Sequence, residues 1–86
     1  MRHFKWIDWN RQKVRDHGVS PEEVEQSFDR IVSTETRSDG SVRVLNELPS
    51  GKFLWVIWRY DEEEEIPDVF GESDDHPVFV ITAFFP

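Results

Sequence analysis

The chain contains no cysteine, no long apolar run, and no lysine or arginine after Arg59. The absence of cysteine excludes disulfides, zinc–thiolate centres and thiol nucleophiles. No apolar stretch approaches the ~20 residues that a membrane-spanning helix needs, and the first residues lack the apolar segment of a signal peptide. We therefore expect a cytoplasmic protein. We also find no spacing of side chains that predicts a metal site or a cofactor site.

Charge is distributed unevenly along the 86 residues, whose formal net charge is −8. Residues 1–17 contain five lysines and arginines against two aspartates, whereas half of all the acidic residues lie between positions 61 and 75. We predict an acidic loop at 61–77 and interpret it as solvated. Two other readings stay open: carboxylates that bind a divalent cation, without EF-hand spacing, and negative charge that covers a basic surface.

A strand and a short helix are predicted at the N-terminal end. Residues 3–7 alternate between polar and apolar side chains, which is typical of an edge strand. Asp8 follows at a position where its carboxylate would cap the next helix. Gly18 is expected to end that helix, because glycine adopts the left-handed conformation after a helix without steric cost.

The second helix has the clearer start. Ser20 and Glu23 have the spacing of a capping box, and Pro21 suits the first helical position. We place this helix at about residues 20–29. Its buried stripe is predicted to consist of Val24, Phe28 and Ile31.

Strand signals occupy the rest of the chain, in segments 31–37, 42–48, 53–58 and 78–85. The Asp39-Gly40 pair predicts a hairpin between the first two segments. Residues 53–58 are apolar on both faces, which predicts a central strand. We therefore predict one α+β domain over residues 1–86: two short N-terminal helices packed on a twisted antiparallel sheet of four or five strands, in the order β-α-α-β-β-β-β.

One stretch resembles a known family. Phe4-Lys5-Trp6, Asn10, Lys13, the run His17-Gly18-Val19-Ser20, Glu22-Glu23 and Phe28 match the pattern of the BrnT toxins, which have a RelE-like ribonuclease fold. The element around His17 also occurs in other small helix-helix-sheet families of unassigned function. The resemblance implies a bacterial toxin–antitoxin setting, in which the toxin cleaves RNA and a ribbon-helix-helix antitoxin binds it.

The resemblance and the residue chemistry together give a set of candidate catalytic residues: Lys13, His17, Arg43 and Arg59. Basic side chains neutralise phosphate and stabilise the charge that develops in RNA cleavage. The alternative reading is structural. Lys13 would be solvated, His17 would lie at a helix C-terminus, and the two arginines would pair with Glu35, Glu47 or the acidic loop.

The sequence departs from the family pattern where arginines are expected, because the last strand ends in Phe84-Phe85-Pro86. The acidic loop would also repel RNA. We therefore predict a protein-interaction module of this superfamily that lacks full catalytic residues, with an active ribonuclease toxin as the alternative. Partner contacts are predicted at Trp58, Phe84 and Phe85. The expected partner is a ribbon-helix-helix antitoxin or a second copy of the chain, and RNA only if the toxin reading holds.

Overall fold

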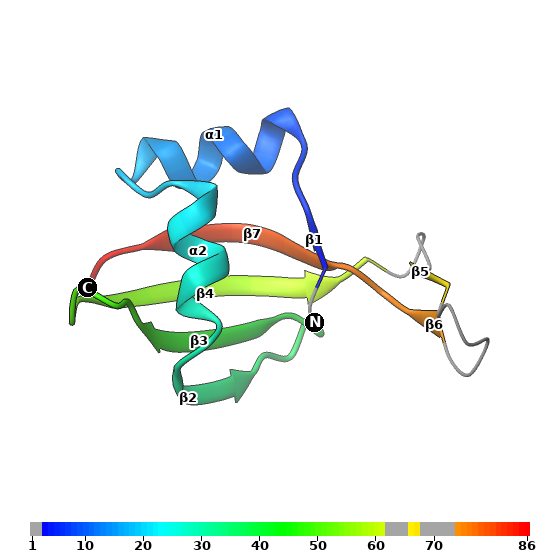
Figure 1. The fold of residues 1–86 in the computed structure, drawn as a ribbon. Coiled ribbons are helices and arrows are strands. Elements are labelled where there is room, and N and C mark those ends of the chain that lie inside the picture. Colours follow the sequence, from blue (N-terminus) through cyan, green and yellow to red (C-terminus); the bar gives the residue numbers. More distant parts are fainter. Residues whose placement is uncertain (1–2, 62–65, 68–73) are drawn as a thin grey trace.

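Two short helices lie on one face of a five-stranded sheet (Figure 1). The computed structural model describes residues 3–61, 66–67 and 74–86. Strand order across the sheet is β1-β7-β4-β3-β2. This arrangement confirms the predicted α+β fold. None of the helices in these ranges is both long and apolar enough to cross a membrane.

The helices begin and end where local chemistry favours it. Helix α1 spans Asp8–Asp16 and α2 spans Pro21–Ser27. The capping box of α2 is confirmed: the Ser20 hydroxyl accepts a hydrogen bond from the Glu23 backbone N–H at 3.1 Å, and the Glu23 carboxylate accepts one from the Ser20 N–H at 3.0 Å. Gly18 has φ of +75°, so the left-handed stop after α1 is confirmed as well.

The start of α1 differs from the prediction. Ile7 is the N-cap residue, and Asp8 is the first residue of the helix. The Asn10 side chain takes the capping role, because its Oδ1 accepts a hydrogen bond from the Ile7 N–H at 2.7 Å. Its Nδ2 donates to the Lys5 carbonyl at 2.9 Å. The fully buried Asn10 therefore fixes the turn from the first strand into the helix.

The sheet contains the predicted strands and one parallel pair. Antiparallel neighbours connect β2 (Ile31–Thr36), β3 (Val42–Glu47), β4 (Phe53–Tyr60) and β7 (Val78–Phe84). Strand β4 is central, as predicted. The prediction of a purely antiparallel sheet needs one correction: β1 (Phe4–Lys5) pairs with β7 in parallel. Both helices and strands β2 to β6 lie between these two strands in the chain, which leaves room for the long connection that a parallel pair needs.

The hydrophobic core lies between the helices and one sheet face. Helix residues Val14, Val24 and Phe28 pack there, with Val19 from the turn between the helices. The sheet contributes residues that point to that face in alternation, except that an irregularity in the pairing of β4 with β7 separates Val80 from Ala83 by three positions. These residues are Val44, Leu54, Val56, Trp58, Val78, Val80 and Ala83. Ile31 does not join this core, contrary to the prediction. It begins strand β2 and is 38% exposed.

Part of the predicted acidic loop forms short strands. Residues Ile66–Pro67 (β5) and Asp74–Asp75 (β6) pair with one another at one end of the main sheet (Figure 1). The first loop residue, Asp61, is not solvated as predicted. It is 6% exposed, and its carboxylate lies 2.7 Å from the Lys5 Nζ. The acidic residues at 62–65, 68 and 72 lie outside the described residues.

Candidate functional site on the open sheet face

The sheet face that points away from the helices carries a group of aromatic and aliphatic side chains. Strand alternation places Trp55, Ile57 and Arg59 of β4 on this open face, because Leu54, Val56 and Trp58 point into the core. The cross-strand neighbours on β7 are Phe84 for Trp55, Thr82 for Ile57 and Phe79 for Arg59. These side chains are half-buried, apart from the exposed Arg59.

Helix α1 extends the open face at the edge beside β7. Trp9 and Lys13 of the helix and its C-cap residue His17 follow one another at intervals of four residues, along the side of the helix that borders β7. The Trp9 ring stacks on Phe79, with ring centroids 6.1 Å apart and an interplanar angle of 14°. The His17 ring lies 5.8 Å from that of Phe84.

The contacts form two rows of rings, each with basic side chains at both ends. In one row, Lys13 Nζ lies 5.5 Å from the Trp9 centroid, and Trp9 stacks on Phe79. Arg59 closes this row, with its guanidinium carbon 4.9 Å from the Phe79 centroid. Distances of this size are typical of cation–π contacts.

The second row runs parallel to the first. His17 contacts Phe84, and Phe84 is the cross-strand neighbour of Trp55. Arg43 of β3 closes the row, with its guanidinium carbon 4.9 Å from the Trp55 centroid. Ile57 and Thr82 lie between the two rows. We call the residues of the two rows, together with Ile57 and Thr82, the open-face patch.

All four predicted catalytic residues therefore belong to one surface. The sequence alone placed Lys13 and His17 on one helix and the two arginines on separate strands, with no means of relating them. The fold brings these four basic side chains to the ends of the two rows of rings, and most of the surface between them is apolar. The aromatic members Trp9, Phe79 and Trp55 were not among the predicted site residues, although the parity that Trp55 shares with Arg59 on one strand was a usable signal.

The two arginines also have structural partners, although only the pairing of Arg43 with Glu35 matches the alternative reading. Arg43 Nη2 lies 3.0 Å from a carboxylate oxygen of Glu35 on the neighbouring strand β2. Arg59 Nη1 donates a hydrogen bond to the Tyr60 carbonyl at 3.3 Å. Each guanidinium thus holds a fixed position on its ring. The predicted partner Glu47 binds Arg30 instead, at 3.1 Å.

The predicted partner-binding residues lie in different places. The predicted partner contact at Trp58 needs correction, because this side chain is only 8% exposed. It packs under α2, with its ring centroid 5.9 Å from that of Phe28. Parity puts Trp55 rather than Trp58 on the open face. Phe84 lies in the open-face patch. Phe85 is half-buried against the core, and Lys52 Nζ lies 5.9 Å from its ring centroid.

In the part of the chain that the structure describes, no group of three or more histidine or acidic side chains is arranged to hold a metal ion. Comparison of the chain with protein-family models, with curated proteins and with solved structures finds no match. The resemblance to the BrnT toxins therefore stays a prediction.

Proposed function

We propose that this protein is a protein-interaction module that binds a partner protein through the open-face patch. The observation that carries the proposal is the patch composition: large rings in the middle, with Lys13, Arg43, Arg59 and His17 at the margins. Aromatic residues and arginine are enriched at protein interfaces and dominate their binding energy. Helix α2 packs on the opposite face and α1 borders the patch along β7, so in the described ranges no helix covers the centre of the patch (Figure 1).

The chemistry of the patch defines the partner. Apolar side chains would pack on Trp55, Ile57 and Phe84, and carboxylates flanking them would meet the basic margin. Charge complementarity of this kind orients a partner and raises the association rate. We therefore expect a partner segment with apolar residues flanked by aspartate or glutamate. A ribbon-helix-helix antitoxin is the partner class that the family resemblance implies.

The ring faces favour a protein over RNA. Single-stranded RNA binds to a sheet by stacking its bases on open aromatic faces. Here Arg59 and Trp9 both lie against Phe79, and Arg43 lies against Trp55. Base stacking would require these side chains to leave their rings, and Arg43 to leave Glu35 as well.

One observation favours the second candidate, a ribonuclease toxin of a type II toxin–antitoxin system. The four basic residues proposed for catalysis are on one surface, where a phosphate backbone could contact several of them. The two candidates differ in what Arg43 and Arg59 do. In the module they steer and hold a protein, whereas in the toxin they stabilise the transition state.

Induced expression separates the two. The wild-type chain and the Arg43→Ala/Arg59→Ala double variant are expressed in a bacterial host, and growth and RNA integrity are followed. We expect no growth arrest with either. If the wild type arrests growth and degrades RNA and the double variant does neither, the chain is a ribonuclease toxin and the interaction-module proposal is refuted.

The binding arm uses the protein encoded by the adjacent reading frame, titrated into the purified chain by calorimetry. We expect the Arg43→Ala/Arg59→Ala variant to bind at least tenfold more weakly, which corresponds to about 1.4 kcal/mol. Arg30→Ala is the matched control, because it removes an arginine that also pairs with a strand glutamate but lies outside the patch. Equal loss in the control would refute the assignment of the surface. Sedimentation velocity on the chain alone tests a second copy as the occupant.

A further inference from the structure

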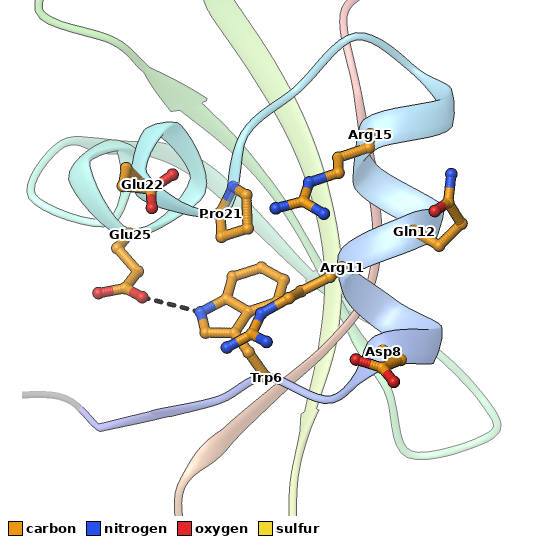
Figure 2. A pocket seen from close by; sticks show the side chains of 8 residues that line it. All are labelled: Trp6, Asp8, Arg11, Gln12, Arg15, Pro21, Glu22 and Glu25. Atoms are coloured by element: carbon orange, nitrogen blue, oxygen red, sulfur yellow. Dashed lines mark hydrogen bonds between the residues drawn. The ribbon is translucent and has the colours of Figure 1, made fainter.

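A second surface feature lies on the opposite side of α1 from the open-face patch. A groove of about 440 Å³ runs between α1 and α2. Figure 2 shows Arg11 and Arg15 extending from α1 toward α2, with Glu22 and Glu25 on the facing helix. Trp6 and Pro21 lie between the two walls. One wall is therefore cationic, the other is anionic, and the floor is largely apolar.

Five charged side chains line the groove, and of the four that face one another across it, Arg11, Arg15, Glu22 and Glu25, three have no partner in the described structure. In the part of the chain that the structure describes, the side chains of Arg11, Arg15 and Glu22 make no hydrogen bond and no ion pair within 4.0 Å. The fourth, Glu25, accepts a hydrogen bond from the Trp6 indole N–H at 2.8 Å. That bond fixes the indole in the floor of the groove. Asp8 and Gln12 lie at the outer part of the α1 wall.

The two walls are held apart by the fold. Val14 of α1 and Val24 of α2 are fully buried in the core, so neither helix can rotate without breaking the core. The connection through Gly18 and the capped Ser20 fixes the direction in which α2 starts. Opposite charges consequently face each other across a space that is wider than an ion pair. A molecule with both charges would contact both walls at once.

We propose that the groove binds a small zwitterion, with a carboxylate at one end, an ammonium group at the other and an apolar middle. The carboxylate contacts Arg11 and Arg15, since guanidinium groups bind carboxylates through paired hydrogen bonds. The ammonium group contacts Glu22. The apolar middle packs on Trp6 and Pro21. The volume of the groove lies within the usual range for small-molecule sites.

The proposal is independent of the proposed function. Arg11 and Arg15 are about half a helical turn away from Lys13 around α1, so the two surfaces share no side chain. Loss of partner binding through the open-face patch would leave the groove unaffected, and the reverse also holds.

The test uses three probes of one length: 6-aminohexanoate, hexanoate and hexylamine. Binding is followed by the indole N–H signal of Trp6 in nitrogen-15 NMR spectra, assigned with Trp6→Phe, at constant ionic strength. For a ligand of this size we expect a dissociation constant of about 1–10 mM for 6-aminohexanoate. Hexanoate and hexylamine each lack one charged contact, and we expect them to bind at least about tenfold more weakly.

Variants on each wall separate the two ends of the ligand. Arg11→Gln/Arg15→Gln is expected to abolish binding of 6-aminohexanoate, and Glu22→Gln to weaken it to the level of hexanoate. The arginines have no partner to lose, and Glu22→Gln loses only the favourable position of its charge in the first turn of α2, so the fold should be retained, which circular dichroism checks. Lys13→Gln, on the opposite side of the same helix, is the matched control and should bind like the wild type.

Equal affinity for 6-aminohexanoate and hexanoate would overturn the proposal, because the anionic wall would then contribute nothing. No shift of the Trp6 signal at roughly tenfold above the expected dissociation constant would overturn it as well. So would a shift that persists in the Arg11→Gln/Arg15→Gln variant, since binding would then take place elsewhere.

Discussion

A buried hydrogen bond between Ser27 and Asn46 ties helix α2 to strand β3, and its removal should destabilise the fold strongly. Both residues are fully buried. Asn46 Nδ2 donates to the Ser27 hydroxyl at 3.0 Å, and that hydroxyl donates to the Val24 carbonyl at 2.7 Å. Asn46 Oδ1 has no hydrogen-bond partner in the described structure. The bond from Nδ2 to Ser27 is thus the one hydrogen bond that the Asn46 amide makes in the described structure.

Ser27→Ala would leave the whole Asn46 amide buried without a partner. The cost of such an unsatisfied group is about 1–3 kcal/mol, and we expect about 2 kcal/mol here. Asn46→Leu removes both the bonded and the unbonded amide atoms and adds apolar surface to the core. The double variant Ser27→Ala/Asn46→Leu should therefore lie within about 1 kcal/mol of the wild type.

Urea unfolding at pH 7, followed by tryptophan fluorescence, measures the free energy of unfolding of the four proteins. At about 2 kcal/mol, Ser27→Ala should lower the melting temperature by roughly 8–16 °C, a range that follows from the size of the domain. The two substitutions should be coupled by about 1–3 kcal/mol. If Ser27→Ala lowers the free energy of unfolding by the same amount in the wild type and in the Asn46→Leu variant, the hydrogen bond does not contribute to stability and the reasoning is refuted.

Three further outcomes follow from local structure. Ser20→Ala removes the acceptor of the α2 capping box and should lower the free energy of unfolding by about 1 kcal/mol, whereas an unchanged urea midpoint would contradict the role of the cap. Gly18→Ala should cost about 1–2 kcal/mol in the same assay, because φ is +75° there although the added methyl has free space, so a neutral result would mean that the turn relaxes. Hydrogen bonds from the Ser41 side chain and backbone N–H lower the pKa of Asp39 below 3.8. The stability that Asp39 adds should be present above about pH 4 and be lost as the pH falls through the lowered pKa. The difference in urea midpoint between the wild type and Asp39→Asn should therefore narrow between pH 7 and pH 2.5. A difference that stays constant over this range would contradict the assignment.

Local sequence signals were sufficient where the physics is local. The capping box at Ser20 and Glu23 depends on groups three residues apart, and the turn at Gly18 depends on one backbone angle. Both were readable without a fold. The cap of α1 was misassigned because Asn10 and Asp8 both have an oxygen within reach of the helix start. Burial of Asn10 under the first strand decides between them.

Composition and strand period determined the fold class. The doubly apolar segment around Trp55 and Trp58 had to be a central strand, and their opposite parity had to put one ring on each face. Which ring points inward was not encoded locally. Packing against Phe28, the C-cap residue of α2, decides that Trp58 is buried and Trp55 lies on the open face.

The sequence by itself determined the α+β class, the stop of α1 at Gly18, the capped start of α2, and the supply of basic and aromatic residues, because these depend on neighbours within a few positions. Tertiary structure alone decided the parallel pairing of β1 with β7 and the meeting of Lys13 and His17 with Arg43 and Arg59 on one surface. The residues that the fold brings together in these two ways are 26 to 74 positions apart in the sequence, from His17 and Arg43 on one surface to Lys5 and Phe79 in the parallel pair. Residues so far apart in the sequence meet only when the whole chain folds around one core, so no local sequence pattern predicts that they meet.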